Sequence, residues 1–447
     1  ENMSQNNMTQ DIQNYISDFD QLKNDDWFSE NRQSALNLFK EVGFPNSRLE
    51  NWKYTDVRPI KKKSFSNVTD TTVSISTEEI NAIRFDGLDC IEVVFINGVF
   101  SKEHSNLDGL DKDLVVENML DALSNDKELL SKHLTKYADD KVSPFTALNT
   151  AFIQNGTFIN VSANTVIEKP INILYLVKDN DGPLATHPRN LIVMGENSEA
   201  TVIESYIGLD DANYFTNAVT EVALSTNAIL KHYKIQQESL NAYHIGNLNV
   251  MQGKDSKLES HSISLGGALV RNDIHGQLAA EGAEIIMNGL YMTNDKQHVD
   301  NHTRVDHLKP RTLSTENYRG VLNGKSRAVF NGKVIVHKDA QKIEAHQNNA
   351  NLLLSDDAEI DTKPELEIYA DDVKCTHGAT VGQLDQNMLF YLRSRAIDEE
   401  TARSLLTYAF ADELISNISF APIRNRLERL VIGQLPDAAL IREFTNE

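Results

Sequence analysis

The sequence contains little cysteine: its 447 residues include two, Cys90 and Cys375. Two cysteines so far apart exclude a disulfide framework, and they fit a reducing cytoplasm. Basic residues are also scarce, because 65 acidic residues outnumber 43 basic ones and the formal net charge is −22. This charge disfavours nonspecific binding to nucleic acid or to an anionic membrane surface.

Long apolar runs are missing as well. The run INILYLV, residues 171–177, is among the longest and falls far short of the roughly 20 residues that cross a bilayer. The first residues, ENMSQNNMTQDIQNY, contain neither a basic nor an apolar segment, so we expect no secretory signal there. Since 40% of the residues are hydrophobic, we expect a soluble protein with a large core and two or three structural regions.

Apolar residues spaced three and four positions apart predict helices near both ends of the chain. They occur at 11–44 and 114–138, with a strand between them at 90–100, so residues 1–156 are predicted to form a mainly helical region with a short β segment. Residues 385–447 are predicted to form a C-terminal helical module, in which Asp398 is a favourable N-cap for the helix that follows.

Residues 157–384 consist of short strand-like pieces rich in Val, Ile, Thr and Tyr. Polar clusters separate these pieces at regular steps: ENSE, STNA, KDSK and EGAE begin at 196, 225, 254 and 281, in steps of 29, 29 and 27. The later clusters GKSR, KDAQ, DDAE and DDVK begin at 324, 338, 356 and 371, at roughly half that step. Repeated strands and polar corners predict a β-solenoid, with a β-sandwich as the alternative.

Several motifs in this region suggest ligand sites but fit them poorly. RGVLNGKSRA, residues 319–328, has three residues between Gly320 and Gly324, where a phosphate-binding loop needs four. We therefore predict a glycine-containing corner and no nucleotide site in this chain; if ATP is used, another protein supplies the site.

Histidines and aspartates are also grouped in this region. The histidines do not have the spacing of a zinc signature, and we predict that they lie on exposed strand faces; they are His302, His307, His337 and His346. A carboxylate pair for glycoside hydrolysis could come from Asp356, Asp357 and Asp361, but acidic corners are expected on so acidic a protein.

The motif Cys375-Thr376-His377 combines a thiol and an imidazole. If this segment is a strand, Cys375 and His377 share one face and Thr376 takes the other. Buried packing is the plainer interpretation, because cysteine is among the most buried residue types. Iron–sulfur clusters usually take four ligands, so a cluster role would require further ligands from a partner and would place the motif at a subunit interface.

Two segments of the sequence resemble one known family. KDAQKIEAHQNNANLLLSDDAEIDTKPELEIYADDVKCTHGATVGQLDQNMLFYLRSRAID, residues 338–398, and GFPNSRLENWKYTDV, residues 43–57, are similar to the SufB/SufD family of the Suf iron–sulfur cluster assembly system, and to its SufD branch in particular. Together with the repeats between them, the resemblance spans most of the chain.

The resemblance implies a right-handed parallel β-helix flanked by helical regions. It also implies a non-catalytic cytoplasmic scaffold subunit that works with a SufB-like paralogue and a SufC-like ATPase. In that family the histidine of the KCxHGA motif assists a nascent iron–sulfur cluster at the paralogue interface, and here that position is His377. Cys375 matches the motif cysteine, and Thr376 stands where serine is common.

The resemblance further implies that the C-terminal helices dock the ATPase. We expect this role in residues 385–435, with Leu405, Phe410 and Leu414 as candidate contacts that could equally be core. An isolated chain could form a homodimer through the surface meant for the paralogue.

Three alternatives remain open at this stage. The chain could be a SufB-type subunit, although SufB would be expected to carry more cysteines. It could be a β-helix carbohydrate-active enzyme, although such enzymes are usually exported. It could also be a purely structural β-solenoid, for which substitution of His377 would have no effect.

Overall fold

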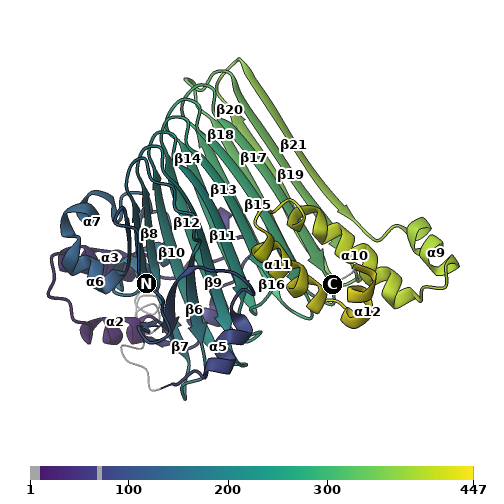
Figure 1. The fold of residues 1–447 in the computed structure, drawn as a ribbon, viewed down its shortest axis with the longest axis horizontal. Coiled ribbons are helices and arrows are strands. Elements are labelled where there is room, and N and C mark those ends of the chain that lie inside the picture. Colours follow the sequence, from purple (N-terminus) through teal and green to yellow (C-terminus); the bar gives the residue numbers. More distant parts are fainter. Residues whose placement is uncertain (1–10, 68–72, 446–447) are drawn as a thin grey trace.

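The computed structural model describes residues 11–67 and 73–445. Its centre is a parallel β-helix built from two facing sheets (Figure 1). Within the described residues the first sheet has eleven strands: β1 (Ser66–Asn67), β4 (Leu114–Asn118), β5 (Thr157–Val161), β7 (Leu184–Thr186), β8 (Arg189–Met194), β10 (Tyr214–Leu224), β12 (Tyr243–Gln252), β14 (Leu269–Leu278), β16 (His298–His307), β18 (Arg327–Val336) and β20 (Glu359–Ile368).

The second sheet has ten strands over the same part of the chain: β2 (Ile91–Ile96), β3 (Val99–Phe100), β6 (Ile171–Val177), β9 (Glu199–Gly208), β11 (Ile229–Gln237), β13 (Lys257–Ser264), β15 (Glu284–Thr293), β17 (Leu313–Leu322), β19 (Ile343–Leu353) and β21 (Val373–Gly382). From β8 to β21 the chain alternates between the sheets, so each strand pairs in parallel with the strand two elements later. The predicted β-helix is therefore confirmed, and the β-sandwich alternative is wrong.

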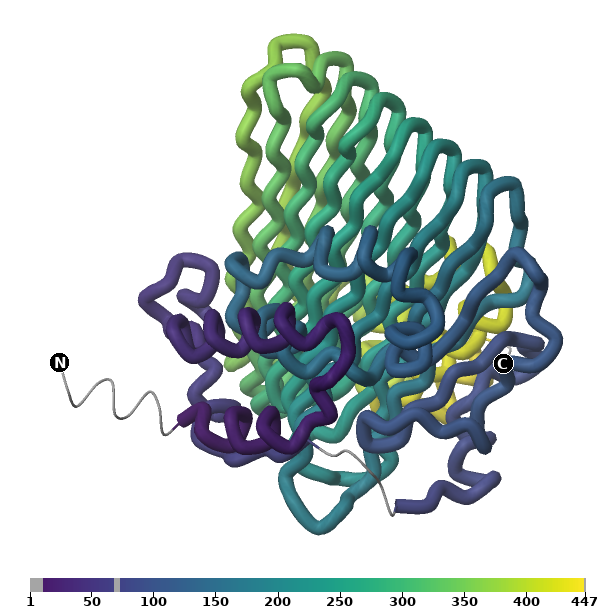
Figure 2. Tube along the Cα trace, turned by 90° about the vertical axis from the view of Figure 1, so that its left-hand side faces the viewer, coloured from purple at the N-terminus to yellow at the C-terminus, as the bar shows by residue number. Residues whose placement is uncertain are grey.

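Helices flank the β-helix on both outer faces: α2 (Gln13–Asp20), α3 (Ser29–Val42), η1 (Glu50–Trp52), α4 (Arg58–Lys61), α5 (Thr77–Ile83), α6 (Met119–Asn125), α7 (Lys127–His133), α8 (Pro144–Ala151), α9 (Gln386–Ser394), α10 (Glu399–Ile415), α11 (Ala421–Gly433) and α12 (Ala438–Thr445). Helices α2, α3 and α8 bury apolar side chains against the first sheet, and α10 and α11 bury theirs against the second. Figure 2 shows these two groups on opposite sides of the coils. None of the helices in the described ranges is both long and apolar enough to cross a membrane.

The helix predicted over residues 114–138 is wrong at its start. Residues 114–118 form strand β4, which pairs antiparallel with β5 and alternates buried and half-buried positions. The helix α6 begins only after Asn118, whose side chain accepts a hydrogen bond from the backbone N–H of Asp121. Period-two burial of the β-branched Val115 and Val116 therefore prevails over the helical spacing of the residues that follow.

The polar clusters are corners between the sheets, and their spacing is now explained. The early clusters at 196, 225, 254 and 281 all lie where the chain passes from the first sheet to the second, once per coil. The later series includes both corners of each coil, which halves the step. Asn197 and Asn227 have positive φ of 53° and 56° at these corners, a conformation that asparagine tolerates better than most residues. The side-chain amide of Asn227 donates to that of Asn197, 3.0 Å away, and so links successive coils.

The N-terminal motif ENWKYT is attached to the outer face of the first sheet. The guanidinium of Arg271 on β14 stacks on the ring of Trp52, 3.8 Å from its centroid. Thr55 donates a hydrogen bond of 2.5 Å to Asp300 on β16, which Arg271 also contacts at 3.2 Å. This motif therefore attaches the N-terminal region to the β-helix.

Candidate functional site

The β-helix ends in an open coil formed by β20 and β21. Each is the edge strand of its sheet and pairs with one neighbour in the described chain, β18 or β19. The coil is capped by no further strand, so many of its side chains are exposed, in contrast to the buried strands before it. Pro364 lies on the edge strand β20, where the missing N–H costs least.

The motif Cys375-Thr376-His377 lies on β21, in the strand that the sequence predicts. Lys374 and Thr376 face outward, since they contact Glu344 at 3.3 Å and His346 at 2.8 Å on the outer face of β19. Cys375 packs with apolar residues on the inner side of the coil. Strand alternation then puts His377 on the same inner side as Cys375.

Cys375 and His377 differ in how accessible they are. Cys375 is half-buried and forms no disulfide, and burial raises the pKa of its thiol. His377 is exposed, and no hydrogen-bond or ion-pair partner exists for it within the described residues. Its ring is therefore available to bind an external group. Cys90 lies in another part of the fold, and burial beside Glu92 raises the pKa of its thiol to about 12.

The prediction that the other candidate histidines lie on exposed strand faces is wrong for His307. His307 is fully buried inside the β-helix, where its ring bonds Thr312 and Ser314 at 2.8 Å each. It occupies an inward position of β16, on the same face as Val305 two residues before it. The remaining three histidines point away from the interior of the β-helix and each pairs with a neighbouring carboxylate, but only His337 and His346 are well exposed, whereas His302 is mostly covered.

The remaining motifs form corners and strand ends. Asp356 and Asp357 are exposed in the corner between β19 and β20, and Asp361 follows on β20. Gly320 ends up within β17, and Gly324 makes the corner to β18 with a φ of 64°. In the described residues no group of three or more His, Cys, Asp or Glu side chains is arranged to hold a metal ion.

The predicted docking residues of the C-terminal module differ in exposure. Leu414 is buried against the second sheet, and Leu405 and Phe410 are partly buried beside it. Arg319 on β17 stacks on the Phe410 ring at 4.7 Å, which holds α10 to the sheet. Whether these three residues contact a partner stays a prediction. Large apolar side chains that are more exposed lie on α9: Met388, Phe390 and Tyr391.

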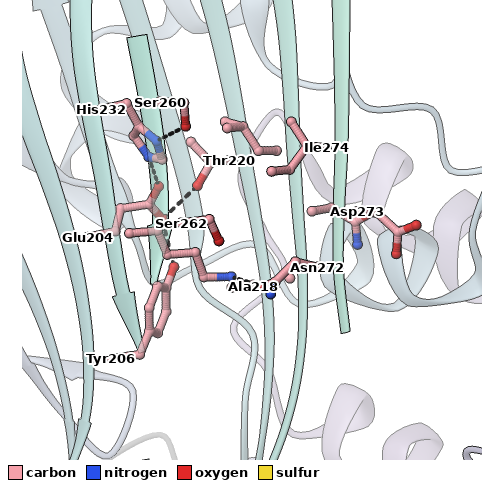
Figure 3. Close-up of a pocket in the computed structure, with 14 residues that line it drawn as sticks. Glu204, Tyr206, Ala218, Thr220, His232, Ser260, Ser262, Asn272, Asp273 and Ile274 are labelled. Atoms are coloured by element: carbon pink, nitrogen blue, oxygen red, sulfur yellow. Dashed lines mark hydrogen bonds and ion pairs between the residues drawn. The ribbon is translucent and has the colours of Figure 1, made fainter. Parts of the chain in front are cut away.

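The sequence analysis missed a polar cluster inside the β-helix. Glu204 on β9 accepts hydrogen bonds from Tyr206 and Thr220 and pairs with His232 on β11 (Figure 3). Lys234 lies beside them, and burial lowers its pKa to about 8. The space between these side chains is about 20 Å³, room for roughly one water. The signal in the sequence was the polar residues at alternate positions of β11, which lie on the inner face of the strand.

Comparisons with known proteins agree with the arrangement. The SufBD core domain of the SUF system for FeS cluster assembly matches residues 175–410, and the SufBD protein N-terminal region matches residues 6–173. An iron–sulfur cluster assembly SufBD family protein of Synechocystis is 33% identical, with 90% of this chain and 89% of the relative covered. The iron–sulfur cluster assembly protein SufD of Escherichia coli is 31% identical, with 91% and 93% covered. SufD of Bacillus subtilis is 24% identical over 94% of this chain and 97% of that protein. The chain therefore belongs to the SufBD family of iron–sulfur cluster assembly proteins.

Proposed function

We propose that this chain is a SufD-type scaffold subunit that helps to assemble a nascent iron–sulfur cluster at an interface with a SufB-like paralogue. The family match and the relatives named SufD support this proposal. In it the chain is not itself an enzyme and has no nucleotide site. It works in the cytoplasm with a SufC-like ATPase, and the cluster is a transient cargo shared with the paralogue.

The observation that carries the proposal is the open last coil. Strand β21 offers an unpaired edge, and such an edge readily pairs with another chain. The exposed imidazole of His377 lies on this strand, with the half-buried thiol of Cys375 two residues before it. One imidazole and one thiol are too few for a cluster that usually takes four ligands, so the paralogue supplies the rest. In isolation, the same edge could pair with a second copy of this chain.

In this proposal the C-terminal helices transmit motion of the ATPase to the last coil of the β-helix. In the proposal the ATPase docks on the module that includes Leu405, Phe410 and Leu414. Arg319 joins β17 to α10 through its stacking on Phe410 and an ion pair with Glu413. A displacement of α10 is therefore passed to the β-helix. The ATPase supplies the free energy that changes the population of open and closed interfaces.

The test reconstitutes the chain with its SufB-like and SufC-like partners and supplies iron and sulfide anaerobically. Cluster absorbance is compared between wild type, His377→Ala and the control His337→Ala, which removes a partly exposed histidine that pairs with Asp306 on β16. Gel filtration confirms that each complex is intact. Loss of the cluster in His377→Ala alone is the expected result. Equal cluster formation in all three complexes would reduce the chain to a structural support.

A further inference from the structure

A row of polar side chains runs inside the β-helix up to His377. Glu316 on β17 is in register with Gln347 on β19, and Gln347 is in register with His377 on β21. The three positions therefore stack on the inner side of successive coils, with neighbouring strands about 4.8 Å apart. Before them, Met287 on β15 occupies the same row. Met287 separates these three residues from Ser260 on β13 and His232 on β11, which belong to the same row.

Gln347 is held in one orientation by the residues around it. Its amide nitrogen donates to the Glu316 carboxylate over 2.8 Å, and both side chains are nearly fully buried, at 4% and 2% exposure. Above its pKa of about 7 the carboxylate of Glu316 only accepts hydrogen bonds, so the amide nitrogen is the end that faces it. The facing strand makes room through Gly332, where an added Cβ would lie 2.2 Å from this nitrogen.

The other end of this amide has no partner. The side-chain oxygen of Gln347 is buried and accepts no hydrogen bond from any described residue. Buried polar atoms are nearly always paired, so an unpaired one next to a candidate site calls for a donor. The ring of His377 lies on the next strand in the same row, is not bonded to any described residue, and can turn its N–H toward this oxygen.

We infer that Gln347 is a positioning residue for His377, with Glu316 as its anchor. The amide oxygen accepts the N–H of one imidazole nitrogen, which fixes the tautomer and leaves the lone pair of the other nitrogen directed out of the open coil. Histidines that bind metals are commonly oriented by such a second hydrogen bond. The inference rests on the proposed function, because it assigns this geometry to the ligand that the site would offer to iron.

The first measurement is made on the isolated full chain with ¹⁵N-labelled histidine at pH 8.5, where an imidazole is neutral. The His377 resonances are identified from their absence in His377→Ala. We expect one tautomer in wild type and in the control Met287→Leu, and a mixture in Gln347→Met. An unchanged tautomer in Gln347→Met, or a mixture already present in wild type, would overturn the inference.

The second measurement is cluster formation in the reconstituted complex. We expect Gln347→Met to slow it about 10- to 100-fold, while Met287→Leu leaves it unchanged. Gly332→Ala displaces the same amide from the opposite strand and provides an independent variant if Gln347→Met does not fold. If His377→Ala abolishes the cluster but neither variant alters the rate, the inference fails and the proposed function stands. If His377→Ala has no effect, the proposed function itself fails.

Discussion

The buried carboxyl of Glu316 makes the stability of this protein depend on pH in a way that one substitution removes. Burial raises the pKa of Glu316 from 4.5 to about 7 in the folded chain. In Glu316→Gln the new amide oxygen still accepts the hydrogen bond from Gln347, so the contact is kept and the ionisation is lost. Glu103→Gln, at an exposed position after β3, is the matched control.

The sign of the effect follows from the two protonation states. Below pH 4.5 the carboxyl is protonated in both the folded and the unfolded chain, and ionisation costs nothing. As the pH rises, the unfolded chain ionises first, so wild type loses stability until the pH passes the folded pKa near 7. A shift from 4.5 to about 7 corresponds to about 3 kcal/mol, of which about 2 kcal/mol falls between pH 5.5 and pH 8.

The assay is urea denaturation of wild type and both variants at pH 5.5 and pH 8, with the free energy of unfolding compared at equal slope. The stability of Glu316→Gln relative to wild type should rise by about 2 kcal/mol at the higher pH. Glu103→Gln should show no such change. If the difference between Glu316→Gln and wild type is the same at both pH values, Glu316 is not buried in the way the structure places it.

Three further predictions concern the scaffold. Asn227→Ala should lower the free energy of unfolding by about 1–2 kcal/mol, because the positive φ that Asn227 adopts is unfavourable for alanine. A thermal unfolding midpoint equal to that of wild type would contradict this conformation. Leu414→Ala should lower the free energy of unfolding in urea by about 2–5 kcal/mol, because it leaves a cavity in the core. An unchanged midpoint would instead indicate that the side chain is free to contact a partner. Gly266→Ala should lower the free energy of unfolding by about 1–3 kcal/mol, since the added Cβ would lie 2.3 Å from the backbone oxygen of Glu238; a neutral result by calorimetry would show that the two backbones are not packed there.

The sequence predicted the fold where the physical signal is local. Asparagine, aspartate and glycine at steps of about 29 residues indicated the corners, because these residues tolerate the turn that each coil needs. Alternation along 373–377 was enough to put Cys375 and His377 on one face, since the side-chain period of a strand is two. Asp398 was identifiable as an N-cap, and its side chain does accept from the backbone N–H of Thr401.

The sequence could not decide which of the two faces points inward. His307 and His346 both belong to polar stretches of strands, yet His307 is buried and His346 is exposed. Strand β4 was missed for a related reason, because its partner β5 begins almost forty residues later and the local spacing favours a helix. In both cases the deciding contact is made with a distant strand.

By itself, then, the sequence determined the solenoid, its corners and the pairing of a thiol with an imidazole on one strand. The stacking of Glu316, Gln347 and His377 was decided only by the tertiary structure. Paired positions in successive coils are separated by 31 residues between the first two and by 30 between the last two, and elsewhere by as few as 26. Because coil length varies, the row that a residue joins depends on how every preceding corner closes, and that is set by packing between the sheets.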